Sequence, residues 1–417
     1  MEVKMSTIQL TKISQTFNQD AISDVEKTVR EQLSRVQLTF KPRARIAIAV
    51  GSRGIANLAC IVKTTVDWIR DQGGDPFIVP AMGSHGGATA DGQQQVLASY
   101  GVMPEKINCP ICSSMEVVEL SQGNLEHRLF IDRNAHQADG VVLINRIKPH
   151  TDFHGTYESG LVKMSVIGLG KERQAQEMHR YGVYGLKELI PRAAATLLAS
   201  GKIILGIGIV ENAYDQTFVI EAIMPQQIMN REPELLEQAR KNMPKLPTDK
   251  LDVLIIDRMG KDISGAGIDT NIIGRIKIRG EKEPEVPDIK MIVVTDLTAA
   301  SHGNATGIGL ADVTTKRLFE KIDFAATYLN TVTSAFLERG KLPIVAETGK
   351  IALDYTLRAC GLTPTEQKKI IRIKDTLHLD ELYVSQAVLD EINGQKEFRI
   401  IRMPGSLFDE AGDFQEF

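Results

Sequence analysis

The chain has 417 residues, of which 43% are hydrophobic and 24% charged, and its formal net charge is −4. A chain of this length exceeds one comfortable hydrophobic core, so we expect two domains. The slightly negative charge argues against a nucleic acid or an anionic membrane as a partner, and no apolar run reaches the ~18–20 residues of a membrane span.

Strand and helix patterns alternate through the first half of the chain. Short apolar runs predict buried parallel strands, and apolar residues with helical spacing predict the helices between them. The strands are expected at residues 45–50, 77–82, 140–145 and 202–209, and the helices at 57–72, 89–100 and 186–199. This order predicts a mainly parallel sheet that is covered by helices on both faces.

Cys109 and Cys112 have the CxxC spacing of redox and zinc motifs. No second CxxC or nearby Cys/His pair completes a metal site, so we interpret them as two incidental thiols. Four cysteines do not make a disulfide framework in a chain this long, which fits a reducing compartment. Because the first residues also lack the pattern of a signal peptide, we expect a cytoplasmic protein.

A polar stretch with two prolines, residues 241–248, marks the expected domain boundary. The alternation then restarts, with strands expected at 251–256, 290–295 and 342–347 and helices at 311–321, 324–336 and 350–360. We therefore predict two α/β domains, residues 1–245 and 250–417, each a mainly parallel sheet flanked by helices. The active site is expected in the cleft between them.

Three glycine- or proline-containing loops each follow a predicted strand directly. They comprise residues 51–53, 83–85 and 148–150. Ligands of parallel sheets bind outside the carboxyl ends of the strands, so the loops converge on one site if the strands are neighbours. Arg53 offers a forked donor for a carboxylate or phosphate, and the turn with Ser84 and His85 is suited to holding an anion. His150 and His85 are candidate reactive groups because imidazole titrates near neutral pH.

His150 and His154 are followed by Glu158 at the same spacing. On a helix this pattern would present zinc ligands on one face, although Pro149 and Gly155 favour a loop. The pattern leaves open a zinc-dependent hydrolase that uses these three side chains. A non-catalytic protein that binds sugars or phosphates is a further alternative.

Two lysines are placed for functional roles. Lys163 lies in the apolar segment 161–168, where burial would lower its pKa and make the amine nucleophilic unless the side chain reaches water. Lys261 and Asp269 lie in a glycine-rich loop after the first predicted strand of the second domain. They are candidates to bind a substrate carboxylate and a substrate hydroxyl.

Taken in order, these segments resemble the nickel-pincer lactate racemase family of 2-hydroxyacid racemases and epimerases. The resemblance implies a nickel ion held in a pyridinium-3,5-dithio mononucleotide cofactor. His85 and His150 match the two acid/base histidines of the family, and His154 is a rival for the second role. Lys163 matches the lysine that tethers the cofactor, and His179 matches the nickel ligand.

The resemblance also implies that Arg53 and Ser84 contact the cofactor, that Arg53, Lys261 and Asp269 bind the substrate, and that cofactor-maturation proteins bind transiently. The implied reaction inverts C2 by hydride transfer to and from the cofactor, while a histidine on each side exchanges the hydroxyl proton. The loop of the second domain lacks a Tyr-Gln pair expected of a lactate racemase. Gly265 and Gly267 leave room for a longer, polyhydroxylated acid.

Overall fold

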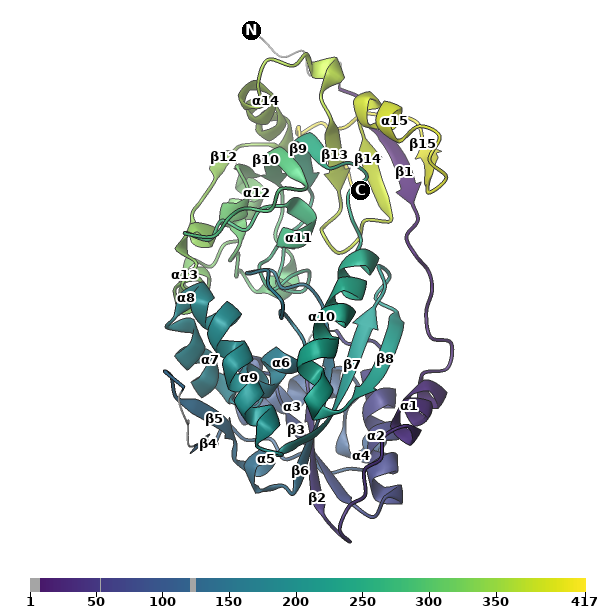
Figure 1. The fold of residues 1–417 in the computed structure, drawn as a ribbon. Coiled ribbons are helices and arrows are strands. Elements are labelled where there is room, and N and C mark those ends of the chain that lie inside the picture. The colour runs from purple at the N-terminus through teal and green to yellow at the C-terminus, as the bar shows by residue number, and fades with distance from the viewer. Residues whose placement is uncertain (1–7, 53, 121–124) are drawn as a thin grey trace. The chain divides into compact units, whose positions relative to one another are not determined.

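The computed structural model describes residues 8–52, 54–120 and 125–417. These fall into two compact units (Figure 1), one of which spans Asn18–Met243, while residues 8–17 belong with Pro244–Phe417 in the other. The assignment of residues 8–17 therefore differs from the predicted division into residues 1–245 and 250–417. Strand β1 (Thr11–Gln15) leaves the expected first domain because it pairs with β14 (Glu381–Val384) and β15 (Phe398–Arg402).

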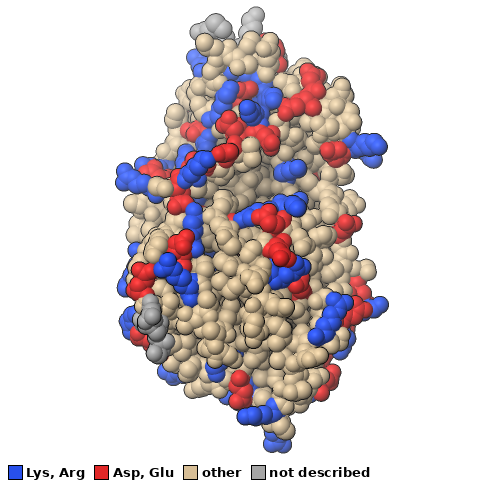
Figure 2. Space-filling view, viewed as in Figure 1, with Lys and Arg blue, Asp and Glu red and all other residues tan. Residues whose placement is uncertain are grey.

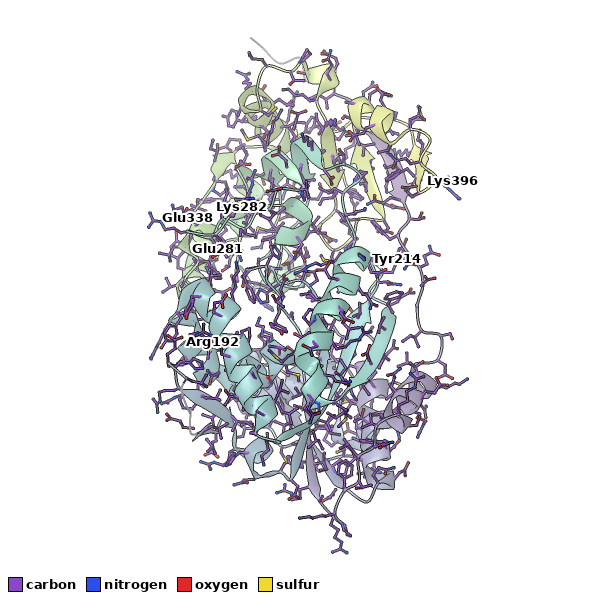
Figure 3. All side chains as sticks on the ribbon, viewed as in Figure 1. Arg192, Tyr214, Glu281, Lys282, Glu338 and Lys396 are labelled. Atoms are coloured by element: carbon purple, nitrogen blue, oxygen red, sulfur yellow. The ribbon has the colours of Figure 1, made fainter. Side chains whose placement is uncertain are left out.

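The unit Asn18–Met243 is built on a sheet with the strand order β3-β2-β6-β7-β8. Its strands are β2 (Arg45–Val50), β3 (Asp75–Pro80), β6 (Gly140–Arg146), β7 (Ile203–Glu211) and β8 (Thr217–Ile223). The first four are parallel, and they confirm the strands predicted in this half of the chain. The unpredicted β8 runs antiparallel to β7 after a turn that contains Tyr214, labelled in Figure 3.

Helices cover both faces of this sheet. They are α1 (Val25–Ser34), α2 (Leu58–Asp71), α3 (Ala90–Ser99), α4 (Pro104–Ile107), α5 (Arg133–Gln137), α6 (Leu161–Lys163), α7 (Lys171–His179), α8 (Gly182–Tyr184), α9 (Ile190–Ala199) and α10 (Pro225–Asn242). Alternate residues of β2, Ile46 and Ile48, pack into one core with α1 and α2. On the other face α6 and α10 approach β7 closely, since a Cβ at Gly206 would lie 2.7 Å from a methyl of Leu161.

The second unit holds a mixed sheet in the order β12-β11-β10-β9-β13-β14-β1-β15. The first five strands are parallel and the remaining pairings are antiparallel. The further elements are β9 (Lys250–Ile256), β10 (Asp288–Val294), β11 (Val313–Thr315), β12 (Ile344–Ala346), β13 (Ile370–Ile373), α11 (Thr270–Ile273), α12 (Lys316–Phe319), α13 (Phe324–Ser334), α14 (Gly349–Ala359) and α15 (Gln386–Ile392). The strands predicted at 251–256, 290–295 and 342–347 and the last two helices are confirmed.

The helix predicted at 311–321 is wrong in its first half. Val313, Thr314 and Thr315 form β11 instead, which pairs with β10 and β12. All three residues are β-branched and favour extended backbone, and α12 begins only at Lys316. A small sheet of β4 (Val117–Leu120) and β5 (Leu129–Asp132) was not predicted either.

The charged side chains on the surface agree with the small net charge of the sequence. On the face shown in Figure 2, Lys and Arg side chains are interspersed with Asp and Glu. One such pair joins Arg192 of α9 (Figure 3) to Glu126, with 3.0 Å between Nη1 and Oε1. Within the described part of the chain, no helix combines the length and the apolar character that a membrane span requires.

Candidate active site

The loops after β2 and β3 meet at the carboxyl edge of the sheet in the unit Asn18–Met243. Oγ of Ser52 lies 2.6 Å from Nδ1 of His85. The two loops were predicted to converge if their strands are neighbours, and β2 and β3 are parallel neighbours. Arg53, which was predicted to bind cofactor and substrate, lies outside the described residues. Ser84 is exposed beside His85.

The side chain of Gln93 in α3 forms hydrogen bonds to the backbone of the His85 loop. Nε2 of Gln93 donates to the carbonyl oxygens of Gly83, at 2.8 Å, and His85, at 3.3 Å. The other side of the same amide, Oε1, accepts a hydrogen bond of 3.1 Å from Nζ of Lys171. Because Gln93 is fully buried, this amide fixes the loop with little freedom.

Lys171 in turn forms a buried ion pair with Asp132. Nζ of Lys171 lies 3.3 Å from Oδ2 of Asp132, and both side chains are fully buried. Nζ also donates to the carbonyl oxygen of Pro80, at the end of β3. Burial raises the pKa of Asp132 and lowers that of Lys171, and the opposite charges counteract both shifts. Sequence analysis did not single out this pair or Gln93.

His150 lies in the loop after β6, the other neighbour of β2. Its Nδ1 accepts the N–H of Asp152 at 3.0 Å, and its Nε2 contacts Nζ of Lys163. The ring packs on Phe153, which is 1% exposed, with 4.6 Å between ring centroids. The structure therefore brings together His150 and Lys163, which were predicted separately, and holds the imidazole between a backbone donor and a buried ring.

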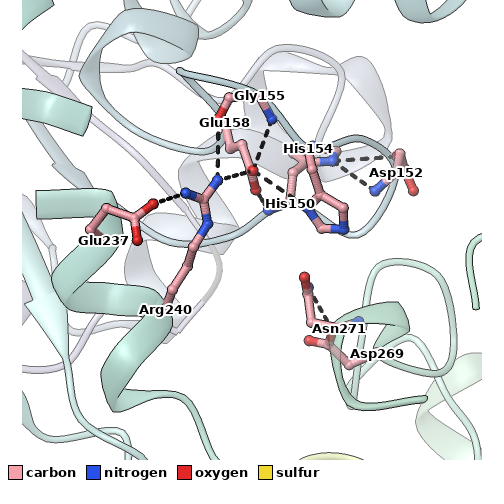
Figure 4. Close-up of polar contacts among 9 residues, drawn as sticks. All are labelled: His150, Asp152, His154, Gly155, Glu158, Glu237, Arg240, Asp269 and Asn271. Atoms are coloured by element: carbon pink, nitrogen blue, oxygen red, sulfur yellow. Dashed lines mark hydrogen bonds and ion pairs between the residues drawn. The ribbon is translucent and has the colours of Figure 1, made fainter. Parts of the chain in front are cut away.

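Glu158 organises the loop that carries His150 and His154 (Figure 4). Its Oε2 accepts the N–H of His150 at 2.6 Å, and its Oε1 accepts the N–H of Gly155 at 3.1 Å and Nη2 of Arg240 at 2.5 Å. Nδ1 of His154 lies 3.4 Å from the same Oε1. Burial acts to raise the pKa of Glu158, but these hydrogen bonds and the charge of Arg240 bring it below its ordinary value.

This arrangement does not supply the zinc site of the hydrolase alternative. Both carboxylate oxygens of Glu158 are taken up by N–H groups and a guanidinium. Among residues 8–52, 54–120 and 125–417 no group of three or more His, Cys, Asp and Glu side chains is placed to hold a metal ion. His150 and His154 lie in a loop, as Pro149 and Gly155 indicated, and not on one helix face.

Lys163 and His179 lie at the ends of consecutive helical segments that a turn separates, since Lys171 has a positive φ of 58°. Lys163 ends α6, the π-helical segment Met164–Gly168 follows, and His179 ends α7. Burial lowers the pKa of His179, and a charged Lys163 lowers it further while the Asp152 carboxylate opposes both effects. Because the charges of Lys163 and Asp152 both affect the pKa of His179, His179 lies within electrostatic range of the loop that carries His150. A neutral imidazole is the form that binds metals.

Glu232 of α10 supports the start of the helix that carries Lys163. Its Oε2 accepts the N–H of Val162 at 2.9 Å, while its Oε1 has no hydrogen-bond partner among the described residues. A Cβ at Gly160 would lie 2.5 Å from this carboxyl group, so the glycine is needed for the close approach. The side chain is completely buried, and burial raises the pKa of Glu232 to about 7.

Glu232→Gln is expected to make the protein more stable at pH 8. Because the folded-state pKa is about 7 against an ordinary 4.5, the contribution of Glu232 to stability is full below about pH 4.5 and is lost as the pH rises to about 7. The variant has no carboxyl group to ionise and so keeps this stability. The difference in the free energy of unfolding amounts to roughly 3 kcal/mol at 1.36 kcal/mol per pKa unit. Urea unfolding at pH 5 and pH 8, followed by the fluorescence of Trp68, measures the difference.

The control for this prediction is Glu234→Gln, which removes an exposed carboxyl group from the same helix. It should shift the free energy of unfolding little, and equally at both pH values. A stability gain in Glu232→Gln that does not grow between pH 5 and pH 8 would contradict the assignment of a buried, neutral carboxyl group.

The two predicted substrate residues of the unit that contains Pro244–Phe417 are both engaged locally. The N–H of Lys261 donates to Oγ of Ser301 at 2.9 Å, and its Nζ donates to the carbonyl oxygen of Gly265 at 2.8 Å. Oδ1 of Asp269 accepts the N–H of Asn271 at 2.9 Å and so caps α11 (Figure 4). Asp269 therefore has a structural task besides any contact with substrate.

Comparison with known proteins finds a protein family and solved structures that resemble this chain. Residues 1–188 match the family described as the lactate racemase N-terminal domain. The fold is similar to that of the lactate racemase apoprotein from Thermoanaerobacterium thermosaccharolyticum, with a TM-score of 0.52 and 12% identity over 88% of this chain and 98% of that chain. No curated protein sequence matches the chain. At this identity, the structural similarity shows a shared fold.

Proposed function

Because the chain belongs to the lactate racemase family through its residues 1–188, we propose that it is an isomerase that inverts C2 of a 2-hydroxyacid. One observation carries the proposal beyond the family. His85 and His150 follow β3 and β6, the strands on either side of β2. Neighbouring strands are ~4.8 Å apart, and the loops that carry the two histidines are separated by one strand. Their imidazoles could therefore lie on either side of a small acid.

In this proposal the two histidines exchange the hydroxyl proton from opposite sides. A base that takes this proton must lie within hydrogen-bond reach of it and titrate near the working pH. Ser52 and Gln93 hold His85 and its loop, while Phe153 and the N–H of Asp152 hold His150. Inversion follows when hydrogen leaves C2 on one side and returns on the other.

The side chains present fit the nickel-pincer cofactor that the family implies. His179 would ligate the metal, because burial lowers its pKa and favours the neutral ring. A pincer brings its own sulfur donors, so one imidazole from the protein suffices. When bound, the cofactor supplies an acceptor for the hydrogen of C2.

Lys163 would tether the cofactor. Since Nδ1 of His150 accepts the N–H of Asp152, the proton of a neutral His150 ring lies on Nε2. The contact between Nε2 of His150 and Nζ of Lys163 holds the amine at this loop, and the uncharged form of an amine is the nucleophilic one. Arg53 and Ser84 are proposed cofactor contacts, and Arg53, Lys261 and Asp269 proposed substrate contacts. Cofactor-maturation proteins would bind transiently, and the cytoplasm is the proposed compartment.

The proposal is tested by expression together with cofactor-maturation proteins, followed by metal analysis and chiral chromatography of a panel of 2-hydroxyacids. We expect near-stoichiometric nickel in the wild type and interconversion of the stereoisomers of at least one acid. His179→Ala should lose the nickel. The control His136→Ala should keep it, because His136 lies on α5, which precedes β6 and so lies at the amino ends of the parallel strands.

Two results would contradict the proposal. Zinc that persists in His179→Ala would favour the hydrolase interpretation, despite the engagement of Glu158. A nickel-loaded protein that inverts none of the acids would show that the family fold serves another reaction.

A further inference from the structure

The side chain of Lys171 connects three elements of the unit Asn18–Met243. Its Nζ donates to the carbonyl oxygen of Pro80, at the end of β3, and to Oε1 of Gln93 in α3 at 3.1 Å. The carboxylate of Asp132, at the end of β5, lies 3.3 Å from the same nitrogen. An ammonium group has three N–H donors and no acceptor, so three surrounding oxygens suit it. The position of Nζ is therefore fixed from three directions.

The placement of Lys171 costs free energy in two ways. The residue is 0% exposed, and a buried charge loses its hydration. Its backbone has a positive φ of 58°, a conformation that residues other than glycine adopt only at a cost. Strained residues of this kind cluster at functional sites, where the surrounding structure holds them in place. Both costs point to a task for this lysine beyond packing.

Gln93 transfers the position of Nζ to the loop that carries His85. Its Nε2 donates to the carbonyl oxygens of Gly83, at 2.8 Å, and His85, at 3.3 Å. Reversal of this amide would turn its N–H groups toward the ammonium group of Lys171 and its oxygen toward the two carbonyl oxygens. The donor on Lys171 therefore determines that the amide presents its N–H groups to the loop.

The segment just before Lys171 contacts the same loop through its backbone. The N–H of Gly83 donates to the carbonyl oxygen of Gly168 at 3.3 Å. A Cβ at Gly83 would lie 3.0 Å from Cγ2 of Ile167, so the loop and this segment approach closely. Gly168 ends the π-helical segment Met164–Gly168, and such segments occur frequently at functional sites. The His85 loop is thus held by this segment as well as by Gln93.

Helix α7 extends this arrangement to His179. The helix has nine residues, of which Lys171 is the first and His179 the last. At 1.5 Å per residue, its ends are about 12 Å apart. Because a helix this short is stiff, the anchoring of Lys171 also restricts the position of His179. The His85 loop and the ring proposed to bind nickel are therefore connected through the two ends of one helix.

We propose that Lys171 is a positioning residue for His85, which acts through the amide of Gln93 and fixes the His85 loop relative to α7. These contacts hold the imidazole where it exchanges the hydroxyl proton of the substrate, while Lys171 and Gln93 stay buried beneath the loop. The role of His85 in this inference rests on the proposed function. The ordering of the loop by Lys171 is independent of that function.

Gln93→Glu separates positioning from stability. The variant keeps an acceptor for Nζ of Lys171 but replaces the N–H donors that face the loop by an oxygen. We expect the protected backbone amides of residues 83–89 to exchange their hydrogens at least tenfold faster, while exchange in β2 and β6 changes less than twofold. Hydrogen exchange of the full chain, followed by mass spectrometry of peptides, measures both without any cofactor.

Lys171→Met should have the same effect on the loop, because Oε1 of Gln93 loses its donor and the amide is free to turn. Gln94→Glu is the matched control, since it introduces the same side chain at an exposed position of α3. It should leave the exchange of residues 83–89 unchanged. Gln93→Met, which removes both ends of the amide without adding a charge, gives the same comparison if Gln93→Glu does not fold.

The kinetic test uses the nickel-loaded protein. A displacement of about 1 Å in a reacting group costs about 10²-fold in rate. We therefore expect Gln93→Glu to lower kcat for inversion about 10²-fold per bound nickel, with KM and nickel content changed less than twofold. Lys171→Met should lower kcat per bound nickel similarly. A merely structural role would instead reduce the folded fraction and leave kcat per bound nickel as in the wild type.

Two results would overturn the inference. One is exchange of residues 83–89 that stays unchanged in both Lys171→Met and Gln93→Glu, or that rises equally in all strands. The other is an unchanged kcat per bound nickel in both variants. If the wild type inverts no acid but both variants exchange faster in this loop, the proposed function fails and the ordering of the loop by Lys171 is supported.

Discussion

Replacing His85 or His150 by alanine is expected to slow the inversion of the substrate by about 10²–10⁴-fold, the usual contribution of a general acid or base. Each histidine handles the hydroxyl proton on one side, and inversion uses both sides. Either substitution alone should therefore suppress interconversion in both directions. Chiral chromatography on the nickel-loaded variants measures the rate, and nickel content shows whether a variant has lost activity or only its cofactor.

His154→Ala is the matched control for this prediction. His154 lies in the same loop as His150, but its ring is directed to the carboxylate of Glu158 and its side chain is 37% exposed. We expect the rate to fall less than threefold in this variant. If His154→Ala is inactive and His150→Ala is active, the second acid/base role belongs to His154.

Asp132→Ala is expected to lower the free energy of unfolding by about 3–5 kcal/mol, the cost of leaving one charge of a buried pair without its partner. The substitution leaves Nζ of Lys171 buried and removes the carboxylate that caps α5 by accepting the N–H of Ala135. Urea unfolding followed by Trp68 reports on this unit, because the chain has one tryptophan and its ring lies against Phe40, with 5.8 Å between ring centroids.

The double variant Asp132→Ala with Lys171→Met separates the charge from the packing. Removing both charges should restore much of the stability that Asp132→Ala loses, because no unpaired charge remains buried. Lys171→Met introduces no new backbone strain, since Lys171 already adopts a positive φ of 58° with a side chain present. A double variant as unstable as Asp132→Ala alone would assign the loss to the α5 cap and to the hydrogen bonds that Lys171 donates to Pro80 and Gln93.

Much of the fold could be predicted because its parallel strands carry local signals. β2, β6 and β9 are mostly apolar along their length, as expected of strands that are buried on both faces of a sheet. β1 has the sequence Thr-Lys-Ile-Ser-Gln, and nothing nearby indicates its partners. Its pairing with β14 and β15 is visible only in the structure, as is the short strand β11 within a predicted helix.

The candidate site was predictable to the extent that its residues follow strands. His85 and His150 could be selected in this way. The contact between Ser52 and His85 could be predicted only with knowledge of the strand order. Glu232 had a signal that was not used, since it occupies the apolar stripe of α10 together with Ile228 and Leu235. A carboxyl group at such a position indicates burial.

Other parts of the site carry no local signal. Asp132 ends the apolar strand β5 and Lys171 begins α7, and only the packing of α7 against β5 makes them a pair.

The placement of β1 has a consequence for synthesis on the ribosome. Lys12 pairs with Tyr383, so β14 is synthesised about 370 residues after β1. At roughly 5–20 residues per second, β1 waits about 20–70 s for β14. Residues 18–243 have their whole sheet available long before that moment. A nascent chain that still lacks β14 and β15 therefore carries β1 without these partners, and its exposed strand edges can be bound by chaperones.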